Sequence, residues 1–521
     1  MPERSQGVTL RVAMDTGLEF GQWDKLQELC SSVFSERPLF VASNRGPLEH
    51  YINPTGRIES RKGSGAIVTA LNALTQMVDL TWISAALGEG DRRMIEEGNE
   101  TKVKSNLPGQ RIYARYVNIP RRTYHKYYNV FCNPLLWYLQ NYMWNFPYNP
   151  NLGADVHQAW NTGYVTVNEL FSEAVKNESL ETGKDQIILI HDYHLYLLGG
   201  FVRQQFPNAI MQHFSHIPWP SAQHWLMLPK NIREAIFRSM IANNILGFQS
   251  KRDVRNFLTS CEEFVPDCQV DYSKSSISSS LGNCYVKAYP ISINLDDIQR
   301  IADSPRVKEY QQELKKQISN KVIVRVDRGE PTKNIVRGFK AFELLLNRYP
   351  DLRGNVSFLA FVVPSRPHIR QYQRYMDEIN RTVSDINSRF GTESWQPIVT
   401  YLENNYTQAV AGLKLYDVLL VNPVVDGMNL IAKEGPIVNQ RNGTVILSET
   451  TGAFEELKDW VVGVAPTDIE GTMNAMYQAL ALTDVERELN SEGLIKHLRH
   501  KDISSWLCDQ LSDISDLIGK G

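Results

Sequence analysis

The stretch KVIVRVDRGEPTKNIVRGFKAFELLLNRYPDLRGNVSFLAFVV (321–363) contains two apolar runs on either side of a helix-like segment. The runs at 321–327 and 355–363 are rich in Val and other strand-forming residues, which favours strands buried on both faces of a sheet. The segment at 334–349 repeats its apolar residues at helical spacing. A strand, a helix and a second strand in this order are typical of a βαβ unit. The stretch therefore predicts an α/β fold with a parallel sheet.

The same alternation extends in both directions along the chain. Further apolar runs occupy residues 38–44, 80–86, 186–192 and 209–216, and then 397–402, 417–423 and 444–449. Two sets of alternation over 521 residues predict two Rossmann-like, doubly wound domains, because one hydrophobic core rarely serves so long a chain. The expected parts are an extension at 1–37, domains at 38–290 and 291–490, and a C-terminal helical segment at 491–521. Helices are also predicted around 22–34, 368–390 and 503–518.

The composition is that of a globular protein with little net charge. Basic and acidic residues number 55 and 58, which gives a net charge of −3. So small a charge provides no general attraction for nucleic acid or an anionic membrane, and we expect neither partner. No apolar run approaches the roughly 20 residues that span a bilayer, and no signal peptide is recognisable. The six cysteines show no CxxC spacing. Scattered thiols suit a reducing compartment, so we expect a cytoplasmic protein.

Polar side chains crowd the predicted carboxyl ends of the strands in both halves. The clusters are Ser43–Pro47, His191–His194, His216–Pro220, Arg328–Asn334, Pro364–Arg366 and Asp426–Leu430. A single charged residue after a strand is usually a solvated loop charge. Ligands of doubly wound domains lie beyond these strand ends, however, so the clusters together predict a site in a cleft between the two domains.

The segment DGMNLIAKE (426–434) predicts a turn followed by the start of a helix. Gly427 permits a tight turn, and a helix N-terminus has unpaired N–H groups that can hold a diphosphate. Glu434 lies far enough into the helix to accept hydrogen bonds from ribose hydroxyls. Arg328 and Lys333, on a separate loop, supply the cations that a departing diphosphate needs. The alternative interpretation of the segment is an ordinary capped helix.

Two histidine pairs, His191/His194 and His213/His216, provide four imidazoles that could bind zinc. Both pairs lie where a strand passes into a loop, and there side chains three residues apart diverge. We therefore expect no metal site and no cofactor, and we assign these side chains to contacts with sugar hydroxyls.

As a set, these motifs resemble the trehalose-6-phosphate synthase family of retaining glycosyltransferases, over about residues 38–490. The resemblance implies a GT-B fold, in which two Rossmann-like domains face each other across the active site. The first domain would bind the acceptor and the second the nucleotide sugar. The implied reaction transfers a hexosyl group, usually from UDP-glucose, to a phosphorylated acceptor such as glucose 6-phosphate.

The resemblance also assigns roles to individual residues. The matching catalytic residues are Arg328, Lys333, Asp426 and His216. The matching donor-binding residues are Gly65, Met428, Asn429, Leu430 and Glu434. The matching acceptor-binding residues are Arg45, Tyr128, Trp137, Asp192 and Arg366. In this scheme the two acceptor-side arginines contact the phosphate, and Tyr128 and Trp137 form aromatic walls.

Three positions depart from the family pattern. The family's Gly-Gly-Leu reads Ser64-Gly65-Ala66, and its second Trp, three residues after Trp82, is Ala85. Its Arg-Leu-Asp-x-x-Lys-Gly motif carries Gly329, Glu330 and Asn334 at the substituted positions. The last two departures resemble the pseudoglycosyltransferase branch that makes validoxylamine 7′-phosphate. The intact DGMNLIAKE instead resembles the sugar-transferring members.

Three hypotheses remain open from the sequence. The first is a transferase that makes trehalose 6-phosphate or an analogue such as glucosylglycerol phosphate. The second is a pseudoglycosyltransferase that joins a nucleotide-activated cyclitol to an amino-cyclitol phosphate. The third is a non-catalytic sugar-phosphate sensor, which the intact set of Arg328, Lys333, Asp426 and Glu434 disfavours, because an acceptor sensor needs no diphosphate clamp. A homo-oligomer is compatible with all three.

Overall fold

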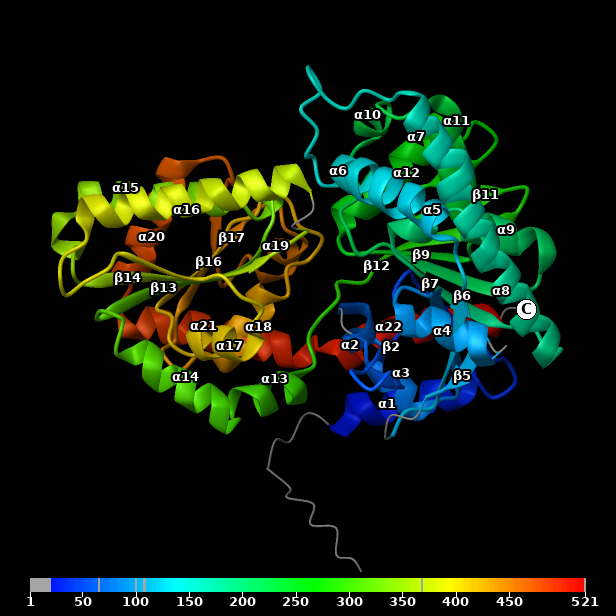
Figure 1. Cartoon of the computed structure of the whole chain (residues 1–521), viewed down its shortest axis with the longest axis horizontal. Helices are drawn as coiled ribbons and strands as arrows, with labels where there is room; N and C mark the ends of the chain where they lie inside the picture. Colours follow the sequence, from blue (N-terminus) through cyan, green and yellow to red (C-terminus); the bar gives the residue numbers. More distant parts are fainter. Residues whose placement is uncertain (1–19, 64–65, 99–100, 106–108, 367–368, 520–521) are drawn as a thin grey trace, which may run out of the picture.

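The computed structural model describes residues 20–63, 66–98, 101–105, 109–366 and 369–519. Two α/β halves lie side by side, each built on its own sheet (Figure 1). The first sheet is completed by β12 (Gly282–Ala288), and the chain enters the second half at α13 (Leu295–Ala302). The predicted arrangement of two doubly wound domains is therefore confirmed.

The first sheet has the strand order β10-β11-β12-β9-β8-β7-β1-β4-β6-β5. Neighbouring strands from β12 to β6 are parallel, and antiparallel strands extend the sheet at both ends. Its other strands are β1 (Leu39–Ala42), β4 (Leu80–Ala85), β5 (Lys102–Lys104), β6 (Ile112–Val117), β7 (Ile187–His191), β8 (Ile210–Phe214), β9 (Ile245–Phe248), β10 (Gln269–Asp271) and β11 (Ser276–Ser279). Central strands β1, β7 and β8 are buried throughout, as their continuous apolar runs predict.

The second sheet is parallel throughout, in the order β15-β14-β13-β16-β17-β18. Its strands are β13 (Lys321–Gly329), β14 (Val356–Pro364), β15 (Ile398–Tyr401), β16 (Val418–Val421), β17 (Thr444–Ser448) and β18 (Val462–Val464). One face packs against α15 (Ile335–Arg348), α16 (Arg370–Phe390) and α20 (Ile469–Ala481). The other packs against α14 (Pro305–Lys315), α17 (Tyr406–Leu413) and α18 (Ile431–Val438). Because all strands run the same way, their carboxyl ends lie at one edge of the sheet.

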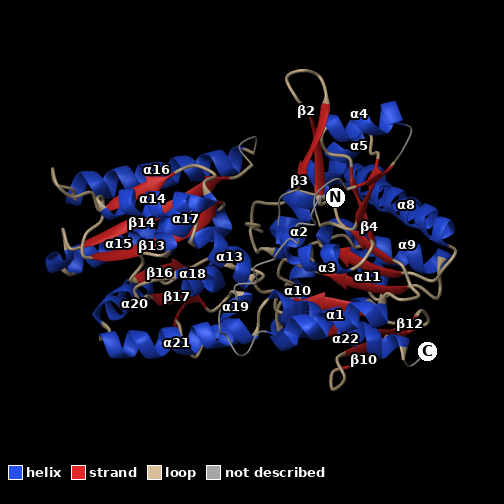
Figure 2. Cartoon of the chain, turned by 90° about the horizontal axis from the view of Figure 1, so that it is seen from below, coloured by secondary structure: helices blue, strands red, loops and turns tan. Residues whose placement is uncertain are grey.

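The strands predicted from apolar runs are all present. The hairpin β2 (Leu48–Ile52) and β3 (Ile58–Lys62), which projects from the first half in Figure 2, was not predicted. Its residues are mostly exposed or half-buried, so they lack a continuous apolar run. The π-helical segment η1 (His125–Leu136) was also missed, because the apolar pattern of a sequence does not distinguish π-helix from α-helix.

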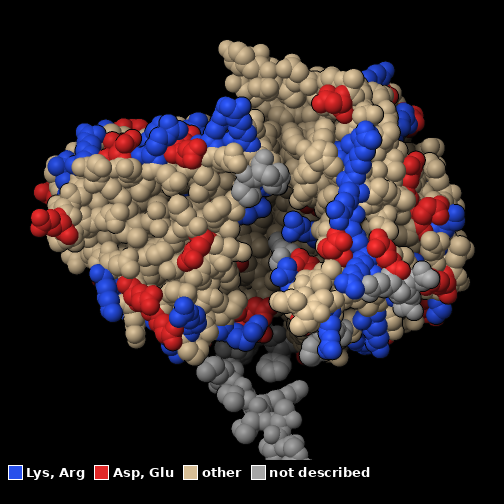
Figure 3. All heavy atoms as spheres, viewed as in Figure 1, with Lys and Arg blue, Asp and Glu red and all other residues tan. Residues whose placement is uncertain are grey.

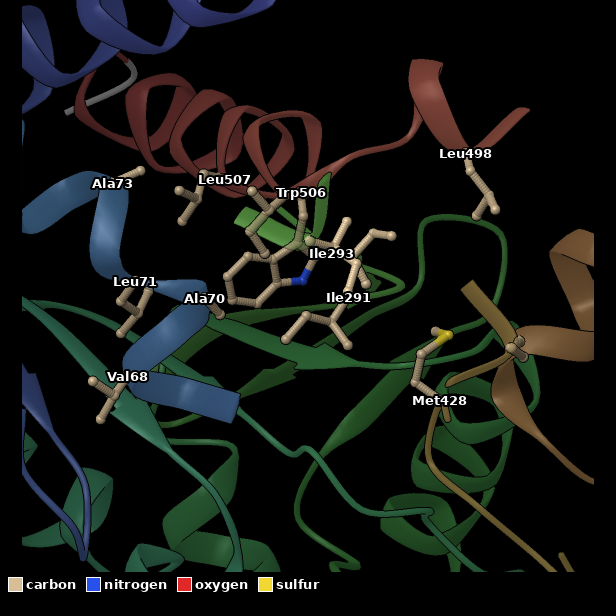
Figure 4. Close-up of a cluster of buried hydrophobic side chains, with 14 of the residues drawn as sticks. Val68, Ala70, Leu71, Ala73, Ile291, Ile293, Met428, Leu498, Trp506 and Leu507 are labelled. Atoms are coloured by element: carbon tan, nitrogen blue, oxygen red, sulfur yellow. The ribbon is translucent and has the colours of Figure 1, made fainter. Parts of the chain in front are cut away.

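The last helix, α22 (Ile503–Ile518), returns from the second half and packs on the first. Figure 4 shows Trp506 and Leu507 facing Ala70 and Leu71, which lie near α2 (Ala66–Ala70) and α3 (Asn72–Met77). The Trp506 indole donates a hydrogen bond to the Tyr289 carbonyl oxygen at 3.1 Å. Helix α1 (Phe20–Val33) belongs to the same hydrophobic cluster, so the two ends of the described chain share one core.

The expected limits of the domains stay predictions. Helix α21 (Asp484–His500) runs through the predicted boundary at residue 490 without a break. Within the described part of the chain, no helix combines the length and apolar character needed to cross a bilayer.

Candidate active site

The surface is hollowed between the two halves, and Lys and Arg side chains lie on both walls (Figure 3). The halves touch where Gly427, beyond β16, meets His216, beyond β8. A Cβ atom added to Gly427 would lie 2.2 Å from the His216 carbonyl oxygen, a distance that Cβ atoms essentially never show. A Cβ atom at Gly452 would lie even closer to the Gly427 carbonyl oxygen. Two glycines therefore allow the segment after β16 to press against the loop of the first half.

Lys333 and Asp426 form an ion pair at this contact, with Nζ 2.5 Å from Oδ2. Asp426 also accepts a hydrogen bond from the Asn429 amide at 3.1 Å. Burial lowers the pKa of Lys333, but the carboxylates of Asp426 and Asp327 more than offset this, and the pKa lies above its usual value. Lys333 is therefore a permanent cation within the site.

The residue after Lys333 holds the loop in place. Asn334 has a φ of 57°, in the left-handed region, where the family motif has glycine. Asn tolerates this conformation better than most residues. Its side-chain amide donates to the carbonyl oxygens of Asn422 at 2.8 Å and Pro466 at 2.6 Å. The substitution keeps the turn and ties it to two neighbouring loops.

Arg328 lies at the carboxyl end of β13, with 58% of its side chain exposed. Its Nη1 lies 3.2 Å from Oε1 of Glu330, whose side chain is fully buried. Between them, Gly329 leaves room for Met376, because an added Cβ would lie 2.4 Å from the Met376 sulfur. The family's leucine would not fit here beside α16 as it stands.

The segment Met428–Leu430 leads directly into α18. Met428 is buried, Asn429 has a φ of 71°, and Leu430 is the residue before the helix. The N–H groups of these three residues donate to no other described residue. These N–H groups can therefore still donate to an anion, and their role in donor binding stays a prediction. Gly65, the remaining predicted donor-side residue, lies outside the described residues.

Glu434 lies in the first turn of α18 and lines a pocket of about 320 Å³ together with Tyr406 and Lys62. Burial raises the pKa of Glu434 to about 7, while a hydrogen bond from Tyr406 lowers it. Its Oε2 atom has no hydrogen-bond partner among the described residues. A half-buried carboxyl group whose buried Oε2 has no described partner suits a ligand that donates hydroxyl groups.

Asp192 and His216 lie together at the carboxyl ends of β7 and β8. The His216 N–H donates to Asp192 Oδ1 at 3.3 Å, and Asp192 has a φ of 75°. Burial raises the pKa of Asp192 to about 7, although backbone N–H donors lower it. Burial also holds the pKa of His216 well below its usual value, so the imidazole is neutral. A neutral imidazole and a carboxyl group with a pKa of about 7 can both form hydrogen bonds with sugar hydroxyls.

The histidines meet across strands rather than along them. His191 Nδ1 lies 3.2 Å from His216 Nε2, whereas His213 lies against the Asp192 carbonyl oxygen at 3.1 Å. Within the described ranges, no group of three or more His, Cys, Asp or Glu side chains is arranged to hold a metal ion. The expectation that no metal takes part stays a prediction.

Aromatic rings lie on the wall of the cleft that the first half of the molecule forms. Tyr128, in η1, stacks on His194 and on Tyr124, with ring centres 5.7 and 5.4 Å apart. Trp137 lies under the guanidinium of Arg366, which comes from the loop after β14 in the second half. The predicted acceptor residues Trp137 and Arg366 are thus brought together, although they are far apart in the sequence.

Arg45 is exposed and lines a pocket of about 470 Å³ that also includes Ala85. Hairpin β2–β3 and α4 (Glu89–Gly98) form the other sides of this pocket. Among the described residues that line it, none comes from 138–144, the aromatic stretch that could have replaced the missing Trp. The described residues of that aromatic stretch therefore do not line the pocket beside Ala85.

A family model described as Glycosyltransferase family 20 matches residues 37–516. The chain belongs to that family. Its predicted class, a glycosyltransferase, is thereby confirmed.

Individual relatives of this family 20 chain cover nearly its whole length. Validamine 7-phosphate valienyltransferase of Streptomyces hygroscopicus subsp. jinggangensis is 27% identical over 481 residues, covering 92% of this chain and 94% of the relative. UDP-forming alpha,alpha-trehalose-phosphate synthase of Candida albicans is 30% identical over 482 residues, covering 90% and 95%. The structure of alpha,alpha-trehalose-phosphate synthase from Burkholderia xenovorans in complex with glucose-6-phosphate has a TM-score of 0.76 and 25% identity, covering 92% and 100%. The predicted GT-B fold is confirmed by such neighbours.

The family 20 site also contains residues that were not predicted. Tyr406 contacts Glu434, and Tyr372 accepts a hydrogen bond from Arg366 Nη1 at 2.5 Å. Lys433 is fully buried, donates to the Ile291 carbonyl oxygen at 2.8 Å and pairs with Glu456. No local motif marks these partners, because each comes from a different element. Of these residues, only Lys433 could have been noticed in the sequence, because it is a charged residue among the apolar residues that begin a predicted helix.

Proposed function

We propose that this glycosyltransferase moves a glucosyl group from UDP-glucose to glucose 6-phosphate or a close phosphorylated analogue, with retention of the anomeric configuration. The observation that carries the proposal is the contact of Gly427 with His216. Asp426 directly precedes Gly427, and the backbone N–H of His216 donates to Asp192 Oδ1, so the Lys333–Asp426 pair and the Asp192–His216 pair both adjoin this contact. A donor sugar and an acceptor bound by these two groups would meet in the cleft.

The leaving diphosphate is the centre of the proposed chemistry. Arg328, Lys333 and the free N–H groups of Met428–Leu430 would stabilise its growing negative charge. The diphosphate oxygen would then take the proton of the acceptor hydroxyl on the same face of the sugar. Asp426 is engaged by Lys333 and Asn429, so its assigned role is to hold the donor rather than to attack it. Positioning of the two substrates would supply much of the remaining rate.

We also propose that the reaction needs no metal ion. Two cationic side chains and a helix N-terminus provide the positive charge that a metal supplies in other diphosphate sites. Activity is expected to persist in EDTA. Loss of activity on chelation, with recovery on adding Mg²⁺ or Zn²⁺, would contradict this part of the proposal.

A second candidate is transfer of a cyclitol group to an amino-cyclitol phosphate. It is favoured by Glu330, Asn334 and Ala85, the departures from the family motif, and by the similarity to validamine 7-phosphate valienyltransferase. Against it, DGMNLIAKE is intact and Glu434 lines the pocket of about 320 Å³. A sensor without catalysis is disfavoured, because the cations for a leaving group are all in place.

The deciding experiment is a mass-spectrometric product screen. UDP-, GDP- and ADP-hexoses are each combined with glucose 6-phosphate, glycerol phosphates and an amino-cyclitol phosphate. A phosphorylated disaccharide made from UDP-glucose and glucose 6-phosphate is expected. A product formed only with the amino-cyclitol phosphate would favour the second candidate instead. The same screen on wild type and an Arg328→Ala, Lys333→Ala double variant excludes a contaminating activity.

A further inference from the structure

Glu330 is a buried carboxylate between groups that the proposed reaction assigns to two different substrates. Its side chain is fully buried, at the carboxyl end of β13. Its Oε1 atom lies 3.2 Å from Arg328 Nη1 and accepts a hydrogen bond from the Ser365 hydroxyl at 2.9 Å. One oxygen atom therefore joins the loop after β13 to the loop after β14.

The strand register explains why these groups meet. In the parallel pair β13–β14, Arg328 is opposite Val363 and Gly329 is opposite Pro364. The next residues on the two strands are Glu330 and Ser365, so they face each other at the same edge of the sheet. Glu330 also receives the N–H of Lys333 on its carbonyl oxygen, at 2.9 Å. The two donor-side cations thus flank Glu330 in the chain and are both tied to it.

Arg366 follows Ser365 directly. It has a φ of 45°, a conformation that turns its side chain toward Trp137 and Tyr372. Burial lowers the pKa of Arg366, but Tyr193, Tyr372 and Glu330 raise it, and the pKa lies above its usual value. The hydrogen bond of Ser365 to Glu330 therefore constrains the backbone next to Arg366.

We propose that Glu330 is a positioning residue that sets the separation of the two phosphate-recognising arginines, Arg328 for the donor and Arg366 for the acceptor. Its charge orients Arg328, and its length reaches Ser365 and so fixes the backbone beside Arg366. The inference rests on the proposed function, which assigns the two arginines to two substrates. The family motif has Asp at this position, one methylene shorter, so the reach to Ser365 is a property of this chain.

Two substitutions separate charge from reach. Glu330→Gln keeps the length and can still accept from Ser365, but it removes the ion pair with Arg328. We expect the KM for the nucleotide sugar to rise about tenfold, with a smaller change for the acceptor. Glu330→Asp keeps the negative charge, but its side chain is one methylene shorter and no longer reaches the Ser365 hydroxyl. We expect the opposite pattern, in which the KM for the phosphorylated acceptor rises about tenfold. Ser365→Ala should reproduce the Glu330→Asp effect on the acceptor alone.

Glu470→Gln is the matched control. It breaks an exposed Glu–Arg pair, with Arg348, in the same half of the molecule. Its kinetics should equal those of wild type, and near-ultraviolet circular dichroism should show all variants folded. Equal losses of kcat with both KM values unchanged in the two Glu330 variants would indicate a merely structural role and overturn the proposal. Wild-type kinetics in both would overturn it as well.

The design also separates this inference from the proposed function. If wild type transfers no sugar, the proposed function fails, and calorimetry with UDP and with inorganic phosphate as probes replaces the kinetics. The same split is then expected, with UDP weakened by Glu330→Gln and phosphate by Glu330→Asp. Equal affinities of both variants for both probes would overturn the positioning role.

Discussion

The guanidinium carbon of Arg366 lies 4.6 Å from the ring centre of Trp137, and the two residues come from opposite halves of the chain. The Trp137 face stabilises the cation while leaving its edge available to a phosphate. The neighbouring Tyr138 hydroxyl donates to Gln371 at 2.6 Å, which adds a second contact across the cleft. The predicted acceptor residues Trp137 and Arg366 are therefore held together by contacts between the two halves.

Arg366→Ala is expected to weaken phosphorylated acceptors far more than their dephosphorylated counterparts. A charge-assisted hydrogen bond is worth about 1.5–3 kcal/mol, so kcat/KM for the phosphorylated acceptor should fall at least tenfold. Steady-state kinetics on both acceptors measure the ratio. Arg374→Ala, an exposed residue eight positions along, is the control. Equal losses for both acceptors would move the phosphate site elsewhere, with Arg45 as the next candidate.

Gly427→Ala is expected to reduce kcat by about 10²-fold while the protein stays folded. The new methyl group would collide with the His216 carbonyl oxygen and push the two halves apart. A displacement of about 1 Å can cost that much when two substrates must be aligned. Gly519→Ala, where the nearest atom is 3.7 Å away, is the matched control. Normal turnover in folded Gly427→Ala would show that the contact with His216 is dispensable.

Lys333→Ala or Arg328→Ala is expected to lower turnover about 10²-fold or more, through lost stabilisation of the leaving group. Lys333→Ala also leaves Asp426 without its cation, so it should be the more damaging of the two. Single-turnover kinetics report the chemical step directly. Lys340→Ala, on the exposed face of α15, controls for loss of charge. A folded variant of either residue with wild-type rates would contradict the diphosphate clamp.

Ala85→Trp is expected to narrow acceptor choice. The indole would extend into the pocket that Arg45 and Ala85 line. Wild type should accept several phosphorylated acceptors, and the variant should shift toward glucose 6-phosphate. An apolar wall of this kind changes discrimination by about 1–3 kcal/mol. Competition between acceptors in one reaction measures the ratio. A strict wild-type preference for glucose 6-phosphate, unchanged by the substitution, would rule out this role for Ala85.

Asp192→Asn should alter the pH dependence of stability. Burial raises the pKa of Asp192 from 3.8 to about 7, so the folded protein holds a proton that the unfolded chain releases between these values. The stability contributed by this group is present below about pH 4 and is lost as the pH rises through about 7. Asn cannot titrate, so the midpoint of thermal unfolding of the variant, relative to wild type, should be higher at pH 8 than at pH 5. Asp484→Asn, an almost fully exposed residue, should show no such trend.

The sequence predicted the two sheets because their central strands are continuous apolar runs, such as 321–327 and 355–363. The sequence also predicted that site residues following those strands, such as Lys333 and Asp426, lie close together, because parallel strands end at one edge of the sheet. Contacts between residues on opposite sides of the cleft could not be predicted from the sequence. Nothing near Gly427 indicates His216, and nothing near Arg366 indicates Trp137. Side-chain reach was also hidden, because the contact of Glu330 with Ser365 depends on the register of two strands.

The packing of α22 on α1 has a consequence for synthesis of the chain on the ribosome. Cys508 lies against the backbone of Gln22, so the first half receives part of its core from residues made after the second half. Until about residue 518 has left the ribosome, Leu26 and Leu74 lack their final covering. The second half also takes Leu494 and Leu498 of α21 into its core, but these residues are made before α22. The later-made half can therefore complete its interior first, while the earlier one waits with an apolar surface exposed to chaperones.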